Sequence, residues 1–249
     1  MTRRTTVAPV AQKAVRAAGR TAQRQKKSSA VPQGNQPKAS APHKTTAKDT
    51  TPANAPLPTG AGEVRIIGGQ WKRTRLPVAQ RPGLRPTPDR VRETLFNWLG
   101  QDLSGWRCLD AFAGTGALGL EAASRGAVSV LLVEQDAALV AQLFALCQRL
   151  AASAVTVRRG DGIAQLRQCA PASLDLAFID PPFGDSDLFM PALKAAAAAL
   201  SPQGFIYLEA DSAWSEVELQ PMGLVLHRHL RAGAVHAHLL RLAPNTVTL

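Results

Sequence analysis

The sequence predicts an α/β fold in which helices cover both faces of a mostly parallel β-sheet. From residue 107 onward, short apolar runs alternate with segments of helical periodicity, the pattern of βαβ units. The apolar runs are nearly continuous, as expected for strands buried on both sides. Acidic residues follow several of these runs where each strand would end.

Composition favours a cytoplasmic protein with no membrane partner. The chain has 249 residues, of which 45% are hydrophobic, a globular composition. No apolar run approaches the roughly 20 residues that span a bilayer, and the basic start lacks the apolar region of a secretory signal. The three cysteines share no short spacing, so we expect neither a disulfide framework nor a metal site.

Positive charge is concentrated toward the start of the chain. Residues 1–62 carry a formal charge of +10 and residues 65–92 carry +7, whereas residues 93–249 carry −5. This asymmetry favours a polyanionic partner. We expect a disordered basic tail over 1–62, because it has no aromatic residue and few large apolar ones, a basic RNA-contacting segment and helix over 63–100, and a catalytic domain over 101–249.

The basic segment combines cations with an indole ring. Lys and Arg side chains would contact phosphates and Trp71 would stack on an unpaired base, although a run of charges is also typical of a solvated face. The predicted RNA-binding residues are Arg65, Trp71, Lys72, Arg73, Arg75, Arg85, Arg90 and Arg92.

The elements follow in order from these patterns. A helix is expected within 85–99, with Thr87 as its N-cap and Pro88 at its first position. Strands are expected within 107–114, 129–136, 154–161, 174–183 and 204–211, and helices within 117–126, 137–152 and 188–204. Residues 223–242 predict two antiparallel strands about a turn near Ala232 and Gly233.

Acidic residues at four successive strand ends predict the site. They are Asp110, Glu134, Asp161 and Asp180. In open α/β sheets the ligand binds outside the carboxyl ends of the strands, so these side chains should lie together.

The loop after the first strand, "DAFAGTGALG" at 110–119, has GxGxxG spacing. Asp110 ends the strand, and Phe112 and Ala113 intervene before Gly114. An acid at this point would repel a pyrophosphate but suits an ammonium group, which indicates S-adenosylmethionine. The predicted cofactor-binding residues are Asp110, Phe112, Ala113, Gly114, Gly116, Glu134 for the ribose hydroxyls, and Asp161 for the adenine amine.

A stiff acidic corner, "FIDPPFGD" at 178–185, ends a buried strand. Asp180 and the Pro181 carbonyl would accept hydrogen bonds from the exocyclic amine of a base, with Pro182 rigidifying the corner and Phe183 stacking on the ring. This arrangement would turn the nitrogen lone pair toward a methyl donor, so the catalytic residues are predicted to be Asp180, Pro181, Pro182 and Phe183.

Four segments together resemble the bacterial RsmD family: "RIIGGQWKRTRL", "LRPTPDRVRETLFNWL", "LDAFAGTGALGLEAASRGA" and "FIDPPF". The resemblance implies a class I S-adenosylmethionine-dependent methyltransferase fold, Rossmann-like, with seven strands of which the last is antiparallel. It also implies methylation of the N2 amine of a guanine in 16S rRNA, within the small ribosomal subunit or its assembly intermediate. Residues 1–62 and those from 213 onward depart from the family pattern. We expect the protein to act as a monomer.

Other interpretations stay open at this point. They are an amine methyltransferase acting on adenine or cytosine in DNA or other RNA, an NAD(P)-binding oxidoreductase that uses the GxGxxG loop, and a non-catalytic RNA-binding protein. In addition, His227, His229, His236 and His238 would share one face of the terminal hairpin. Solvent-facing or RNA-facing histidines are expected there rather than a metal site.

Overall fold

The computed structural model describes residues 62–79, 87–182 and 184–244. The predicted tail and the predicted site residues Arg85 and Phe183 therefore lie outside the described residues. All the described residues belong to one compact unit, in which residues 63–79 and 87–100 pack with the rest of the domain.

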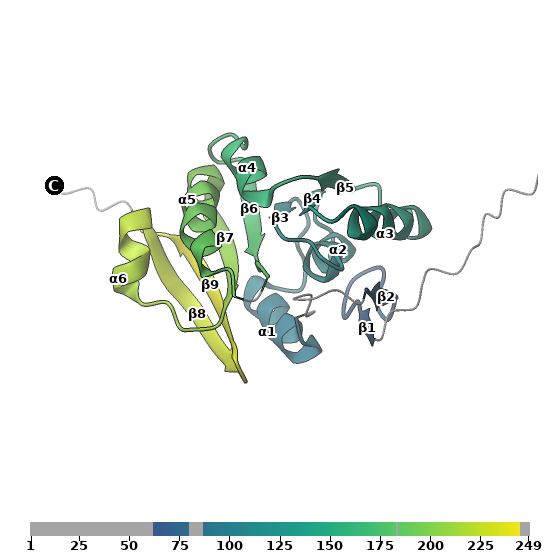
Figure 1. The fold of residues 1–249 in the computed structure, drawn as a ribbon, viewed down its shortest axis with the longest axis horizontal. Coiled ribbons are helices and arrows are strands. Elements are labelled where there is room, and N and C mark those ends of the chain that lie inside the picture. Colours follow the sequence, from purple (N-terminus) through teal and green to yellow (C-terminus); the bar gives the residue numbers. More distant parts are fainter. Residues whose placement is uncertain (1–61, 80–86, 183, 245–249) are drawn as a thin grey trace, which may run out of the picture. The chain divides into compact units, whose positions relative to one another are not determined.

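A seven-stranded sheet forms the centre of this unit, in the order β5-β4-β3-β6-β7-β9-β8 (Figure 1). Strands β3 to β7 are parallel, and β9 pairs antiparallel with both β7 and β8. The prediction of a seven-stranded sheet with an antiparallel last strand is thus confirmed. The strands are β3 (Arg107–Asp110), β4 (Ser129–Glu134), β5 (Val155–Arg159), β6 (Leu174–Ile179), β7 (Leu200–Ala210), β8 (Leu224–Ala232) and β9 (Val235–Leu242).

Helices cover both faces of the sheet, as the continuous apolar runs predict. The helices α1 (Asp89–Leu99), α2 (Ala117–Ser124) and α3 (Ala137–Arg149) share one hydrophobic core with one face. The helices α4 (Gly162–Arg167), α5 (Phe189–Ala199) and α6 (Glu216–Leu219) share a second core with the other face. None of the helices in the described ranges is long and apolar enough to cross a membrane.

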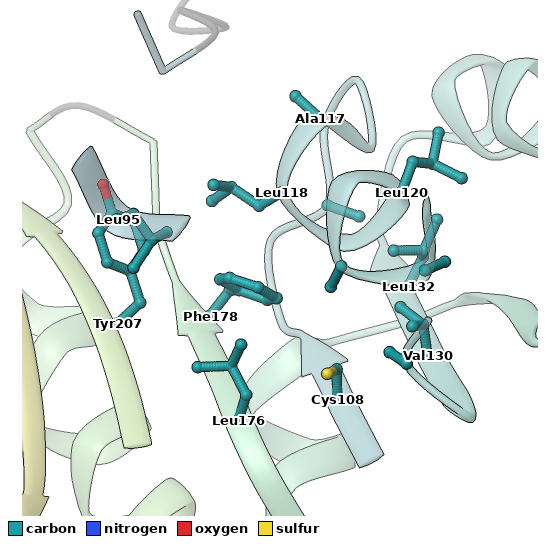
Figure 2. Close-up of a cluster of buried hydrophobic side chains, with 14 of the residues drawn as sticks. Leu95, Cys108, Ala117, Leu118, Leu120, Val130, Leu132, Leu176, Phe178 and Tyr207 are labelled. Atoms are coloured by element: carbon teal, nitrogen blue, oxygen red, sulfur yellow. The ribbon is translucent and has the colours of Figure 1, made fainter. Parts of the chain in front are cut away.

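The first core explains how the motif strands are held. Figure 2 shows Leu176 and Phe178 of β6 beside Cys108 of β3, with Leu118 of α2 close by. Phe178 is fully buried, with its ring centroid 6.2 Å from that of Tyr207 on β7. The parallel strands therefore end at a common edge of the sheet. The packed side chains below this edge hold the strand ends, and the acidic residues there, in place.

The basic segment docks on α2 through backbone contacts. It forms a small hairpin of β1 (Gly62–Arg65) and β2 (Arg75–Val78). The backbone N–H groups of Ile67 and Gly68 each donate to the buried Glu121 carboxylate at 2.7 Å. Gly69 has φ +73°, and a Cβ atom there would lie 1.8 Å from the Ser124 carbonyl oxygen, so only glycine permits this approach.

The same carboxylate binds two arginines in the core. Arg125 Nη2 lies 2.8 Å from Glu121 Oε1, and Arg92 Nη1 lies 3.5 Å from Glu121 Oε2. Arg92 is fully buried and also pairs with Asp89 at 2.6 Å. The prediction that Arg92 binds RNA is therefore wrong, because its guanidinium neutralises a buried acid and no phosphate can reach it.

Two predicted helix boundaries also differ. Helix α1 begins at Asp89 with Pro88 in the N-cap position, so Thr87 is not its N-cap. Helix α5 ends at Ala199 and β7 begins at the next residue, Leu200, although the helix was predicted to extend toward residue 204.

We expect Glu121→Gln to lower the free energy of unfolding by about 3 kcal/mol, because it leaves two buried guanidinium groups without their shared counter-charge. Urea unfolding followed by circular dichroism measures this effect. Glu93→Gln, at an exposed position of α1, is the matched control and should stay within about 0.5 kcal/mol of wild type. Equal stability of the two variants would contradict the role given to Glu121.

Candidate active site

A cavity of about 800 Å³ opens at the carboxyl ends of the strands. This volume lies in the range of small-molecule sites. Among the described residues that line it there is no Lys or Arg. Seven acids line it: Asp110, Glu134, Asp136, Asp180, Asp185, Glu209 and Asp211.

Asp110, the last residue of β3, is buried at the floor of this cavity. Its Oδ2 accepts from the backbone N–H of Gly119 at 3.1 Å, while Oδ1 has no hydrogen-bond partner among the described residues. Burial, with a smaller contribution from the charge of Glu134, raises the pKa of Asp110 to about 7. A buried carboxylate oxygen without a partner suits a cationic ligand group.

Glu134 ends β4 and holds the loop that follows β3. Its Oε2 accepts from the Gly114 N–H at 2.9 Å and its Oε1 accepts from the Asp136 N–H at 2.8 Å. Each carboxylate oxygen keeps a further lone pair. Because Glu134 lines the cavity, these lone pairs are available to hydroxyl donors.

The other predicted cofactor residues divide into two groups. Phe112, Ala113 and Gly114 line the cavity, whereas Gly116 and Asp161 are not among its lining residues. Gly116 has φ +78°, and a Cβ atom there would lie 2.6 Å from Leu143, so helix packing explains this glycine. Asp161 caps α4 by accepting from the Ala164 N–H at 2.7 Å. Cofactor contacts by these two residues stay predictions.

The Asp-Pro-Pro corner lies at the same end of the sheet. Asp180, Pro181 and Pro182 follow β6 and line the cavity. Surrounding protein and the charge of Glu209 raise the pKa of Asp180 well above its ordinary value. The Thr87 hydroxyl lies 3.5 Å from Asp180 Oδ2, which explains why this threonine does not cap α1.

Glu209 is a site residue that the sequence analysis missed. It lies on β7, lines the cavity, and is only 8% exposed. The buried Tyr207 hydroxyl donates to its Oε1 at 2.7 Å. The signal was the one used for the other acids, because Glu209 also ends an apolar run, "GFIYLEAD".

Most of the predicted RNA-binding side chains in the described range are at the surface. Lys72, Arg73 and Arg90 are exposed. Arg65 is exposed and pairs with Asp89, and Arg75 is exposed and pairs with Glu63, each at 2.9 Å. Trp71 is only partly exposed, since it packs against the first core.

Three of the four hairpin histidines cluster. The ring centroid of His229 lies 5.2 Å from that of His236 and 4.7 Å from that of His238. A bulge near Leu226 separates His227, which packs against Phe205 instead. In the part of the chain that the structure describes, no three His, Cys, Asp or Glu side chains are arranged to hold a metal ion.

His238 is fixed as a neutral ring by its surroundings. Burial, with a smaller contribution from the neighbouring His229, lowers its pKa to about 4. Its Nε2 accepts from the Trp214 N–H at 3.1 Å, and its Nδ1 faces the Leu208 carbonyl at 3.4 Å. We infer a structural role for His238 in holding the hairpin to the segment after β7.

The cavity fits S-adenosylmethionine better than a dinucleotide. Its acids match a ligand that carries an ammonium and a sulfonium, and they would repel a pyrophosphate. The unpaired Asp110 Oδ1 lies where the ammonium is predicted, and Glu134 lies where the ribose hydroxyls are predicted.

Comparisons with known proteins agree with this geometry. The family described as conserved hypothetical protein 95 matches residues 64–241. Ribosomal RNA small subunit methyltransferase D of Escherichia coli K12 is 43% identical over 181 residues, which cover 72% of this chain and 90% of that protein. The protein of the same name from Haemophilus influenzae is 38% identical over 184 residues, covering 69% and 95%.

A solved structure shows the same fold. The yhhF protein from Escherichia coli superposes with a TM-score of 0.62 at 37% identity, covering 73% of this chain and 99% of that one. Residues 64–241, which the family matches, include the acids that line the cavity and the Asp-Pro-Pro corner. The chain therefore belongs to the conserved hypothetical protein 95 family and is a methyltransferase of the RsmD type.

Proposed function

We propose that this protein methylates the exocyclic N2 amine of a guanine in 16S rRNA, using S-adenosylmethionine. Its substrate would be the small ribosomal subunit or an assembly intermediate, and it would act as a cytoplasmic monomer. One observation carries the proposal: a single cavity joins the acids of β3 and β4 to the Asp-Pro-Pro corner of β6. The names of its relatives support the rRNA substrate.

The acids of β3 and β4 would bind the cofactor. Asp110 would accept from the ammonium group through its free oxygen, and Glu134 would accept from the ribose hydroxyls. The cofactor, when bound, supplies an electrophilic methyl group on its sulfonium. A ligand cation also favours the ionised forms of the buried carboxyl groups, whose pKa values burial raises.

The corner after β6 would hold the reacting amine. Asp180 and the Pro181 carbonyl would accept from its two N–H groups, which aims the nitrogen lone pair at the methyl group. Because Pro181 is buried and its ring fixes the backbone, the carbonyl keeps its direction without reorganisation. Positioning of this kind supplies much of the rate enhancement in a direct displacement.

The basic segment would contact the RNA backbone outside the cavity. Lys72, Arg73 and Arg90 present exposed cations near the start of the domain. A phosphate is repelled by the acid-lined cavity, so only a base extruded from its stack would enter. As part of this proposal, Arg85 keeps its predicted contact with RNA and Phe183 its predicted stacking on the base.

The direct test is nucleoside analysis of small ribosomal subunits from a deletion strain. After incubation with the protein and isotopically labelled cofactor, we expect labelled N2-methylguanosine by mass spectrometry. Label in an adenine or cytosine nucleoside would show a different amine substrate. Absence of label from every base would contradict the proposed function.

Cofactor affinity should depend on pH through Asp110. The ionised carboxylate binds an ammonium group more strongly, so the dissociation constant should fall as pH rises toward about 7 and then level off. Below that point the change should approach tenfold per pH unit, because one proton is released on binding. Calorimetry from pH 5.5 to 7.5 measures this dependence. Asp110→Asn should abolish it, and an unchanged wild-type dissociation constant across that range would refute it.

Asp180→Ala should reduce turnover by orders of magnitude while leaving cofactor affinity close to wild type, because the acceptor acts on the amine as it rehybridises. Methyl transfer to small subunits, normalised to the folded fraction by circular dichroism, gives the turnover. Asp187→Ala removes an exposed acid from the following loop and is the matched control. Near-normal turnover of Asp180→Ala would exclude the corner as the amine-binding site.

A further inference from the structure

Glu209 stands beside Asp180 at the edge of the sheet. Strands β6 and β7 are parallel neighbours, and Ile179 is paired with Leu208. The next residues along each strand, Asp180 and Glu209, therefore lie side by side and point to the same face. Both line the cavity, yet the amine-binding step described above uses only Asp180.

A hydrogen bond from the buried Tyr207 orients the Glu209 carboxyl group. Tyr207 is fully buried on β7, and its hydroxyl donates to Glu209 Oε1 at 2.7 Å. Burial and the Glu209 carboxylate raise the pKa of Tyr207 well above its ordinary value, so the phenol stays protonated and remains a donor. Tyr207 thus holds the Oε1 side of the carboxyl group, and further lone pairs, including those of Oε2, remain for a ligand.

Burial and the neighbouring groups act on the charge of Glu209 in opposite directions. Burial raises its pKa, but the hydrogen bonds from Tyr207 and Thr87 and the positive charge of Arg92 oppose that rise. The buried Arg92 therefore contributes to the site through its charge, although it cannot reach RNA. Burial and the charge of Glu209 raise the pKa of Asp180 as well, so these adjacent carboxyl groups hold a proton more readily than exposed ones do. Each still has an oxygen that accepts a hydrogen bond, whether it is ionised or protonated.

Of the bases that carry an exocyclic amine, only guanine offers two neighbouring hydrogen-bond donors to a pair of adjacent acceptors. Guanine carries N1–H next to its N2 amine, so it presents two neighbouring donors. Adenine and cytosine carry a ring nitrogen lone pair next to their amines, which would face a carboxylate oxygen directly. Unpaired buried polar groups of this kind are strongly selected against in binding sites.

We propose that Glu209 accepts a hydrogen bond from N1–H of the target guanine while Asp180 accepts from its N2 amine, so that Glu209 selects guanine over adenine and cytosine. This inference rests on the proposed function, since it concerns the base that enters the same cavity. Tyr207 is the positioning residue, because it decides which Glu209 oxygen faces the base.

A base analogue isolates the N1 contact. Small subunits are reconstituted with rRNA that carries either guanine or 2,6-diaminopurine at the methylated position. The analogue keeps the 2-amine but has a lone pair at N1. Wild type should methylate guanine faster by roughly 10- to 100-fold, read as 2-amine methylation by mass spectrometry. Equal rates on the two bases would overturn the proposal without any variant.

Glu209→Gln should reverse the preference. Because the Tyr207 hydroxyl holds the Oε1 side, the amide N–H₂ faces the base, donates to N1 of 2,6-diaminopurine and opposes N1–H of guanine. We expect the guanine-to-analogue rate ratio to fall by roughly 100-fold. Adding Tyr207→Phe to Glu209→Gln removes the hydrogen bond that orients the amide. The amide oxygen can then face N1–H of guanine, so the rate ratio should move back toward guanine. Glu216→Gln, an exposed position on α6, should leave the ratio unchanged.

The outcomes separate this inference from the proposed function. If wild type labels no guanine, the proposed function fails. If wild type methylates guanine but Glu209→Gln leaves the ratio unchanged, or loses both activities equally, the role of Glu209 fails and the proposed function stands. Cofactor affinity by calorimetry and the folded fraction by circular dichroism are measured for each variant, so that misfolding is not read as lost specificity.

Discussion

The buried carboxylate of Glu121 is the interaction on which the arrangement of the domain depends. It accepts from two backbone amides of the N-terminal segment and pairs with Arg92 of α1 and with Arg125, which follows α2. An isolated charge in the core would be costly, but a carboxylate with two guanidinium partners and two amide donors is fully satisfied. Three parts of the chain that are distant in sequence are joined at this one group.

Contacts link the Glu121 carboxylate to the active site through helix α1. Arg92 is anchored to Glu121, and on the same helix α1 the Phe96 ring packs against the Phe178 ring, with 6.5 Å between their centroids. The start of α1 then places Thr87 beside Asp180. The core beneath the sheet edge therefore helps to place the corner that follows β6.

Local signals predicted the mostly parallel sheet and its acid-lined edge, because apolar runs and strand-end acids can be recognised without tertiary contacts. The seven-stranded arrangement was predicted from the resemblance to the RsmD family. The sequence was not sufficient for Arg92. Arg92 shares a helical face with Leu95, Phe96 and Leu99, which follow it by three, four and seven positions. A buried arginine needs an acidic partner, and the sequence alone does not show that the distant Glu121 supplies it. The short helices α4 and α6 were also missed, since six and four residues carry little periodicity. Glu209 was overlooked although its position after an apolar run matched the other acids.

In the N-terminal segment, the groups that attach it to the rest of the domain differ from the groups that it exposes at the surface. The segment is held by main-chain amides at Ile67 and Gly68 and by the absence of a side chain at Gly69, whereas its exposed Lys72 and Arg73 take no part in those bonds. The outward charges can therefore change over evolutionary time without altering how the segment docks. A fold built in this way can be fitted to RNA surfaces of different shape and charge while its catalytic interior remains the same.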